Sequence, residues 1–329
     1  MILAGDIGGT STRLAVFELR NDALRAVVEQ TYSSREYTGL REIVSRFVAE
    51  HRPDIEHASF GIAGPVVDGR VKTPNLPWVI DAQELADELG LAATALLNDL
   101  EANAYGVAAL AASDLVPLNA GAAGVAGNAA VIAAGTGLGE AGLYWDGHRH
   151  RPFAAEGGHA DFAPRNAVEI ELLRYLLQCH EHVSYERVLS GPGLHNIYKF
   201  LRDTGWAKEC GPVVEAMRSR DPAAVISQAG LERSCPLCVQ ALELFVAIYG
   251  AAAGNLALKL MARAGVYVGG GIAPKILATL KGPAFMDAFT AKGRLRTLCE
   301  SIPVRVILNP KTALLGSARY AALQAALLD

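Results

Sequence analysis

The sequence predicts an α/β protein with two domains around a central cleft. Three strand-like runs open the chain, helices and strands then alternate, and a similar order returns after Asn128. Two glycine-rich turns of the same construction, Gly5–Thr10 and Gly135–Gly139, each lie between two apolar strand patterns, one turn in either half. A length of 329 residues also fits about two domains.

In the first half, alternating apolar residues predict strands, and helical spacing predicts helices. The expected strands are Ile2–Ile7, Leu14–Leu19, Leu24–Thr31, Ala58–Ile62 and Ala93–Leu97. Two expected helices are Thr38–Glu50 and Leu100–Ala111. Between them, Asp81 can cap a further helix that ends at Leu89. The alanine- and glycine-rich segment 121–127 is expected to be a mobile loop.

The second half repeats this order with more helices. The expected strands are Ala129–Ala134, Ala141–Trp145, Val266–Val268 and Val304–Leu308. The expected helices are Ala167–Cys179, Ser184–Leu189, Leu194–Leu201, Pro222–Gln228, Pro236–Ala262 and Thr312–Leu328. We expect the last helix to fold back onto the first half. Residues 1–110 and 311–329 would then form a small domain, and residues 111–310 a large one.

Composition and charge exclude several classes of partner. Apolar residues make up 51% of the chain and charged residues 19%, which is enough for a substantial core. The net charge of −4 and the lack of a Lys- or Arg-rich run argue against nucleic acid and against an anionic membrane surface. The start of the chain has no signal-peptide pattern, and an odd number of cysteines suits a reducing compartment. We therefore expect a cytoplasmic protein that binds small molecules.

The most apolar stretch, Leu237–Ala262, is long enough to cross a membrane. Gln240, Glu243, Asn255 and Lys259 interrupt it, where a membrane span of about 20 residues should be free of such side chains. We therefore expect a buried helix between the two domains, and no membrane as a partner.

Each glycine turn can bind an anion. Glycines admit positive φ and close approach, so the backbone N–H groups of a strand, turn and returning strand can converge on a phosphate. Two such turns that face each other would clamp the phosphate chain of a nucleotide. Asp6, inside the first turn, could hold a water molecule bound to Mg²⁺, or it could bond to its own backbone as a turn residue.

Asn98 and Asp99 follow a predicted strand, at the end where open α/β sheets place their ligands. Asp99 could accept the proton of an attacking hydroxyl during phosphoryl transfer. It could equally serve as the N-cap of the helix that follows.

A second polar segment, Glu156–Asp161, places three polar side chains around two glycines. A carboxylate and an imidazole can bond to the vicinal hydroxyls of a sugar, so Glu156 and His159 are candidate sugar ligands. A structural histidine or a metal site are the alternatives. Glu186 lies two residues after Ser184, which can cap a helix, and an exposed ion pair with Arg187 is its plain interpretation.

Two further motifs lie in the second half. Three successive glycines, Gly269–Gly271, directly follow an apolar strand and leave a flat backbone on which a planar base could lie. Cys235 and Cys238 have the spacing of a redox pair or of half a zinc site, but no second pair accompanies them. We expect neither function at these cysteines.

With these segments in this order, the chain resembles the bacterial glucokinase family, in its non-ROK class, within the hexokinase and actin-like superfamily. The resemblance runs nearly end to end. The segments that carry it are the two glycine turns, Asn75–Trp78, Asn98–Asp99, Glu156–Pro164, Glu186–Gly193 and Gly269–Pro274.

The resemblance implies two actin-like (ribonuclease H-like) domains and phosphorylation of the 6-hydroxyl of glucose by ATP with Mg²⁺. It also implies the first step of glycolysis and a homodimer. Asp99 would be the catalytic base, and Asp6 the contact to Mg²⁺ through water. The implied sugar ligands are Asn75, Asn98, Asp99, Glu156, His159 and Glu186. The implied ATP-binding residues are Gly5, Asp6, Ile7, Gly8, Gly9, Thr10, Gly135, Thr136, Gly137, Gly270 and Gly271.

Three positions depart from the commoner family pattern: Pro74, Leu100 and Glu140. None removes a reacting group, but they leave the choice of sugar open. A kinase for another hexose, such as mannose or an N-acetylhexosamine, is the first alternative, and polyphosphate could replace ATP as the donor. A non-catalytic sugar sensor is the second, against which the retained Asp99 argues.

Overall fold

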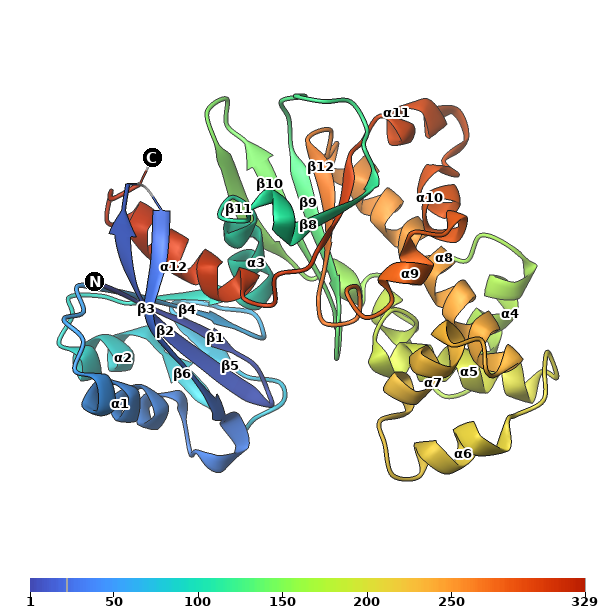
Figure 1. The fold of residues 1–329 in the computed structure, drawn as a ribbon, viewed down its shortest axis with the longest axis horizontal. Helices are drawn as coiled ribbons and strands as arrows, with labels where there is room; N and C mark the ends of the chain where they lie inside the picture. Colours follow the sequence, from blue (N-terminus) through green and yellow to red (C-terminus); the bar gives the residue numbers. More distant parts are fainter. Residues whose placement is uncertain (22, 329) are drawn as a thin grey trace. The chain divides into compact units, whose positions relative to one another are not determined.

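The structure, a computed structural model, describes residues 1–21 and 23–328 and has an α/β fold (Figure 1). The chain divides into two compact units. The first contains Met1–Asp114, Arg151–Ala154 and Asn309–Asp329, and the second contains Leu115–His150 and Ala155–Leu308.

The first unit is built on a five-stranded sheet in the order β3-β2-β1-β4-β7. Its strands are β1 (Ile2–Ile7), β2 (Ser11–Arg20), β3 (Ala23–Ser33), β4 (His57–Ile62) and β7 (Ala95–Asn98). The short strands β5 (Arg70–Lys72) and β6 (Val79–Asp81) form a separate pair. The helices are α1 (Leu40–His51), α2 (Ala82–Leu89), α3 (Asp99–Val107) and α12 (Thr312–Gln324).

Apolar side chains cover both faces of this sheet, because successive side chains along each strand point to opposite faces. On one face, Leu3, Leu14 and Phe60 pack against Phe47 of α1. On the other face, Ile2, Ala4, Ala15 and Phe17 pack against α12 through Leu314, Ala318, Ala321 and Ala322. Helix α12 also contacts α3, so the C-terminal helix belongs to the first unit (Figure 1).

The second unit contains most of a six-stranded sheet in the order β11-β10-β9-β12-β13-β8. Its strands are β8 (Leu115–Asn119), β9 (Ala129–Ala134), β10 (Leu138–Trp145), β11 (His150–Ala155), β12 (Gly265–Gly269) and β13 (Val304–Ile307). Its helices are α4 (Ala167–Leu176), α5 (Gly191–Asp203), α6 (Gly211–Met217), α7 (Pro222–Leu231), α8 (Pro236–Leu260), α9 (Leu277–Leu280), α10 (Pro283–Thr290) and α11 (Arg296–Glu300).

Helix α8 lies inside the second unit. It packs against helices α5, α7 and α10 and against strands β9 and β12, and most of its residues are buried. It is the one helix, among the residues the structure describes, that is long and apolar enough to cross a membrane. The prediction of a buried helix is confirmed. Its expected position between the domains is wrong, because its partners all belong to one unit.

Most of the predicted elements are present, with one clear exception. The segment Ser184–Leu189 is not a helix: it contains only a single 3₁₀ turn, Tyr185–Arg187. The reason lies in Ser190, whose extended backbone and side chain cap the next helix by accepting a hydrogen bond from the Gly193 N–H. Helix α5 therefore starts at Gly191, three residues earlier than expected.

The cysteines also differ from expectation. Cys210 and Cys235, the residues that precede α6 and α8, form a disulfide with a Cα–Cα distance of 6.0 Å. Cys238 is buried one turn farther along α8 and remains a thiol. The expectation of reduced cysteines is thus wrong for this pair, because the fold brings together two residues that sequence spacing does not connect.

Candidate functional site

The first glycine turn joins β1 to β2 and is closed by nearby groups. The Gly8 N–H donates to the Ser11 carbonyl at 2.9 Å. The buried Ser34 hydroxyl donates to the Gly8 carbonyl at 2.8 Å and lies 3.0 Å from the Thr12 hydroxyl. Sequence reasoning missed Ser34 and Thr12. Thr12, two residues after the turn, could have been found as a hydroxyl residue beside a glycine turn, whereas Ser34 is 26 residues from Gly8 and carries no local signal.

Asp6 lies in β1 opposite Arg13 of β2. Burial raises the pKa of the Asp6 carboxyl, and the Arg13 guanidinium opposes that shift. Within the described residues, no cluster of three or more His, Cys, Asp or Glu side chains could hold a metal ion. Asp6 is thus a desolvated carboxyl group next to the turn.

Asn75 lies against the same turn. A Cβ placed on Gly9 would lie 2.7 Å from the Asn75 Cβ. The Thr73 hydroxyl donates to the Leu76 carbonyl at 2.9 Å and so fixes the loop that carries Asn75. Gly8, Gly9, Thr73 and Asn75 line one small hollow of the first unit.

Asn98 and Asp99 lie at the same edge of the first sheet as this turn. The parallel strand pairs place Ile7 beside Ile62, and Ile62 beside Asn98. Because parallel strands end at a common edge, the glycine turn after Ile7 and the carboxylate of Asp99 share it.

Asn98 is the N-cap residue of helix α3. The Asn98 Oδ1 accepts from the N–H of Leu100 at 2.9 Å and of Glu101 at 3.4 Å, and its Nδ2 donates to the Gly64 carbonyl at 3.1 Å. The Asp99 Oδ1 also accepts from the Leu100 N–H, at 3.0 Å, so both side chains bond to the first turn of the helix, although the N-cap position belongs to Asn98. Asp99 is the first residue of the helix.

The second glycine turn joins β9 to β10 and is held by distant groups. The Gly135 N–H donates to the Gly137 carbonyl, and the Gly191 N–H donates to the Gly135 carbonyl, both at 2.8 Å. The Glu186 Oε2 accepts from the Leu138 N–H at 3.0 Å. Glu186 is thus tied to this turn, and its interpretation as a simple ion-pair partner of Arg187 is wrong.

Glu156, His159 and Glu186 come together in the second unit. The Tyr185 N–H donates to the Ala160 carbonyl at 3.0 Å, which joins the two segments that carry these side chains. His159 and Glu186 line one cavity of about 370 Å³. The His159 Nε2 lies 3.9 Å from the Glu156 Oε2, and both side chains are largely exposed.

Two glycines are needed beneath this cluster. A Cβ on Gly157 would collide with the Glu140 carboxylate, and a Cβ on Gly158 would collide with the Leu138 carbonyl. Glu140 is buried, and desolvation raises the pKa of its carboxyl. The polar segment thus rests directly on strand β10.

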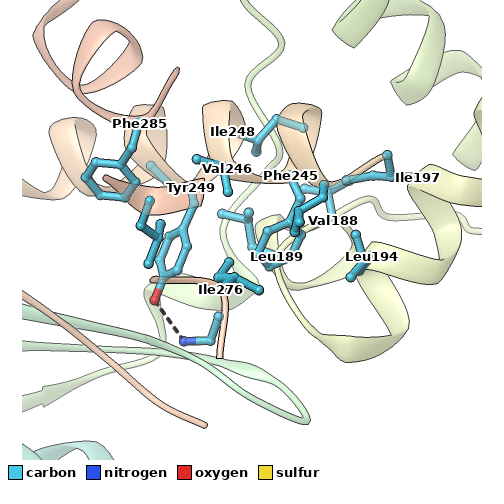
Figure 2. Close-up of a cluster of buried hydrophobic side chains, with 14 of the residues drawn as sticks. Val188, Leu189, Leu194, Ile197, Phe245, Val246, Ile248, Tyr249, Ile276 and Phe285 are labelled. Atoms are coloured by element: carbon cyan, nitrogen blue, oxygen red, sulfur yellow. Dashed lines mark hydrogen bonds between the residues drawn. The ribbon is translucent and has the colours of Figure 1, made fainter. Parts of the chain in front are cut away.

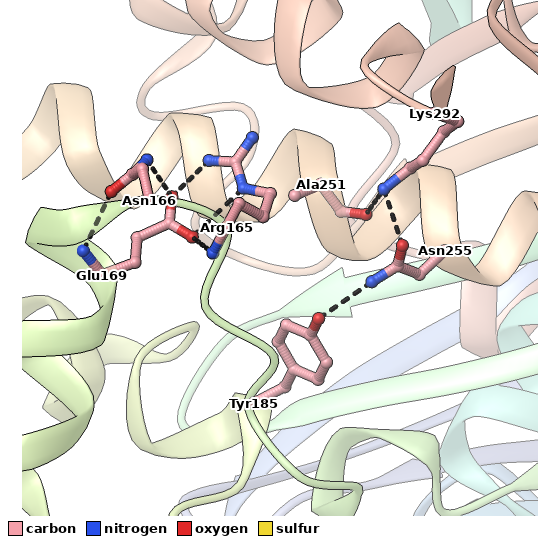
Figure 3. Close-up of polar contacts among 7 residues, drawn as sticks. All are labelled: Arg165, Asn166, Glu169, Tyr185, Ala251, Asn255 and Lys292. Carbon is pink, nitrogen blue, oxygen red and sulfur yellow. Dashed lines mark hydrogen bonds and ion pairs between the residues drawn. The ribbon is translucent and has the colours of Figure 1, made fainter. Parts of the chain in front are cut away.

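A polar network contacts Tyr185, the residue before Glu186 (Figure 3). The Asn255 Nδ2 donates to the Tyr185 hydroxyl at 2.9 Å, and the Lys292 Nζ donates to the Asn255 Oδ1 at 2.6 Å and to the Ala251 carbonyl at 3.0 Å. Burial lowers the pKa of Lys292. Sequence reasoning missed this network because its members are far apart along the chain.

A cavity of about 710 Å³ lies next to the second turn. Its lining includes Gly135, Thr136, Gly271 and residues of α7 such as Ser227 and Gln228. Gly270 has a positive φ of 81°, and a Cβ there would collide with the Ala134 carbonyl, so this position requires glycine. Of the three glycines that were expected to form a flat backbone, Gly271 lines the cavity.

The chain is similar in sequence and structure to known glucokinases. The glucokinase family model matches residues 3–324. A glucokinase from Nostoc punctiforme is 44% identical over 98% of this chain and 99% of its own. The structure of a glucokinase from an Antarctic psychrotroph is 30% identical, has a TM-score of 0.84 and covers 98% of both chains. A glucokinase from Balamuthia mandrillaris, solved with glucose, is 26% identical with a TM-score of 0.75, covering 98% of this chain and 93% of that one.

These likenesses run over nearly the whole of the chain. The expected fold class, two α/β domains of the actin-like type, is confirmed. The chain belongs to the glucokinase family.

Proposed function

We propose that this protein transfers the γ-phosphoryl group of ATP to the 6-hydroxyl of glucose, the first step of glycolysis. The observation that carries the proposal is the shared edge of the first sheet. Strand register brings the glycine turn and Asp99 to that edge, where Asp99 directly follows the N-cap residue Asn98. Full-length membership of the glucokinase family supports glucose as the sugar.

In the proposed reaction, the 6-hydroxyl oxygen of glucose attacks the γ-phosphorus and the bond from that phosphorus to the ADP oxygen breaks. Asp99 accepts the hydroxyl proton. The proton is transferred late in the reaction and needs only a weak base, because the transition state of phosphoryl transfer is loose. Asp99 is the first residue of α3, and a carboxylate side chain can serve as this base.

The remaining polar groups would bind the sugar. Glu156 and His159 offer a carboxylate and an imidazole on an exposed segment. Glu186 uses Oε2 for the Leu138 N–H, which leaves Oε1 to accept from a sugar hydroxyl. Asn75 and Asn98 would contribute amide groups, and Asn98 retains one N–H beyond the bond to Gly64.

ATP would bind through the two glycine turns and the large cavity. The phosphates would lie at Gly5–Thr10 and Gly135–Gly137, whose turns the Gly8 and Gly135 N–H groups close from within, and the adenosine would lie near Gly270 and Gly271. The donor set fits Mg²⁺. That ion commonly keeps several waters and takes one or two carboxylates besides the phosphates, and Asp6 is one desolvated carboxylate beside the turn. When bound, Mg²⁺ would neutralise phosphate charge.

We also propose a cytoplasmic homodimer, in which the Cys210–Cys235 disulfide would be of a kind that is rare in the cytosol. The apolar helix α8 is mostly buried in the second unit, which supports a globular protein in which this helix crosses no membrane. Sedimentation of the purified protein should give about twice the mass of the 329-residue chain.

A panel of hexoses tests the assigned substrate. In an assay that couples ADP formation to a change in absorbance, glucose should give a higher kcat/KM than mannose or N-acetylglucosamine. A preference for either of those sugars would establish the alternative of a kinase for another hexose. No turnover with any sugar, despite glucose binding, would establish a sugar sensor.

A further inference from the structure

Tyr249 is a buried polar group that the proposed chemistry does not use. It lies in α8 with no exposed surface, and its ring packs between the rings of Phe245 and Phe285, whose centroids are 6.0 and 5.8 Å away. Figure 2 shows its hydroxyl leaving this apolar cluster for a backbone nitrogen of the sheet. Burial raises the pKa of Tyr249, so the hydroxyl keeps its proton at neutral pH.

The hydroxyl joins the ends of two parallel strands. It accepts from the Ala134 N–H at 3.1 Å, and its proton can reach the carbonyls of Ile132 and Gly269, each 3.3 Å away. Ala134 is the last residue of β9, and Gly269 is the last residue of β12. One side chain thus bonds to both strands at the edge where they end.

Both turns that border the large cavity start at these bonds. Gly135 directly follows Ala134, and Gly270 directly follows Gly269. The two turns also contact each other, because the Ile272 N–H donates to the Ala134 carbonyl at 3.2 Å. A change in the position of Ala134 would therefore move the glycine turn and the Gly270–Gly271 segment together.

We propose that Tyr249 is a positioning residue for nucleotide binding: its hydroxyl holds the Gly135 turn and the Gly270–Gly271 turn at a fixed separation. It touches no substrate itself. The inference rests on the proposed function, which places the phosphates and adenosine of ATP at these two turns.

The same helix supports the sugar-binding segment through a different residue. Asn255, six residues after Tyr249, bonds to the Tyr185 hydroxyl next to Glu186. Loss of the Tyr249 hydroxyl leaves this contact intact. The effect of Tyr249 should therefore fall on the nucleotide and spare the sugar.

The test compares Tyr249→Phe with Tyr198→Phe in the full-length protein. Tyr198 is also a buried tyrosine of the second unit, but its hydroxyl donates to Glu209 at 3.0 Å, and it borders neither turn. Tyr249→Phe leaves a buried N–H without an acceptor, so we expect KM for ATP and the Kd of AMPPNP to rise roughly fivefold or more, with KM for glucose within about twofold. Tyr198→Phe should change neither KM.

Hydrogen exchange provides a second readout. In Tyr249→Phe, the amides of Gly135–Thr136 and Gly270–Ile272 should exchange faster than in the unaltered protein, while those of Tyr185–Glu186 should not. Unchanged nucleotide affinity and unchanged exchange in a folded variant would overturn the inference, as would equal rises in both KM values. Failure of the unaltered protein to bind AMPPNP would instead overturn the proposed function.

Discussion

The two glycine turns have the same local sequence pattern, but different groups hold them. The first turn is closed by residues of its own neighbourhood, Ser34 and Thr12, which lie in or next to the strands that follow it. The second is held by Glu186, Gly191 and Tyr249, which are all distant in sequence. A shared pattern therefore predicts a shared turn, while the packing of each unit determines what stabilises it.

The edges that carry the turns also differ in chemistry. The first edge holds Asp99 two strands away from its turn, and the second holds the large cavity and the Glu186 carboxylate. Under the proposed function, the first edge supplies the reacting base and the second supplies most of the binding surface. Changes at the first edge should therefore lower kcat, and changes at the second should raise KM.

Asp99→Asn should have the largest effect. The amide keeps the shape of the side chain but cannot accept the proton, so kcat should fall on the order of a thousandfold while the Kd for glucose stays within a few-fold. Steady-state kinetics and calorimetric titration with glucose measure the two quantities. Glu101→Gln, in the same helical turn, is the control and should keep nearly full activity. A kcat for Asp99→Asn near that of the control would remove Asp99 as the base.

Breaking the disulfide should have the next largest effect, and only in the second unit. Cys210 and Cys235 are 25 residues apart and enclose α7, a wall of the large cavity. Cys210→Ser should lower the free energy of unfolding by about 3 kcal/mol in urea under oxidising conditions. Cys179→Ser, at an exposed free cysteine, is the matched control. Equal stability of the two variants would show that the crosslink contributes nothing.

Glu156→Gln should weaken the binding of glucose and spare the binding of ATP. Removal of one hydroxyl acceptor should raise KM for glucose about tenfold and leave KM for ATP nearly unchanged. His159→Ala should act in the same direction. Asp161→Asn is the control, because Asp161 bonds to His182 at 2.8 Å and is not a proposed ligand. Sugar kinetics that stay the same in Glu156→Gln and His159→Ala would exclude this segment from the site.

Ser34→Ala should have the smallest effect. It removes the hydroxyl that bonds to the Gly8 carbonyl and to Thr12, so it should cost about 1 kcal/mol of unfolding free energy and raise KM for ATP a few-fold. Thermal unfolding and ATP titration measure both effects. Ser45→Ala, at an α1 residue away from the turn, should leave KM for ATP unchanged. An equal change in both variants would contradict a specific role of Ser34.

The sequence was sufficient to predict features that depend on neighbouring residues. Strand, glycines and returning strand predict each turn, and the end of β7 predicts the place of Asn98 and Asp99. It could not separate the roles of these two side chains, since both residue types are good caps. The structure places Asn98 at the N-cap, and both side chains accept from the Leu100 N–H.

Features that depend on distant residues were missed for a physical reason. Tyr249 lies 115 residues from Ala134, and nothing local marks a buried tyrosine as a partner of a turn. The apolar composition of α8 predicts burial but does not specify which elements bury it. The Cys210–Cys235 disulfide was missed for the same reason, because the fold of the chain brings the two cysteines together.

Product analysis of the unaltered protein tests the central claim most directly. With glucose, ATP and Mg²⁺, phosphorus NMR should show one new phosphomonoester, identical to glucose 6-phosphate and formed in equal amount to ADP. The same mixture with Asp99→Asn should show almost none over the same time. Release of inorganic phosphate without a sugar phosphate, or phosphorylation at another hydroxyl, would contradict the account.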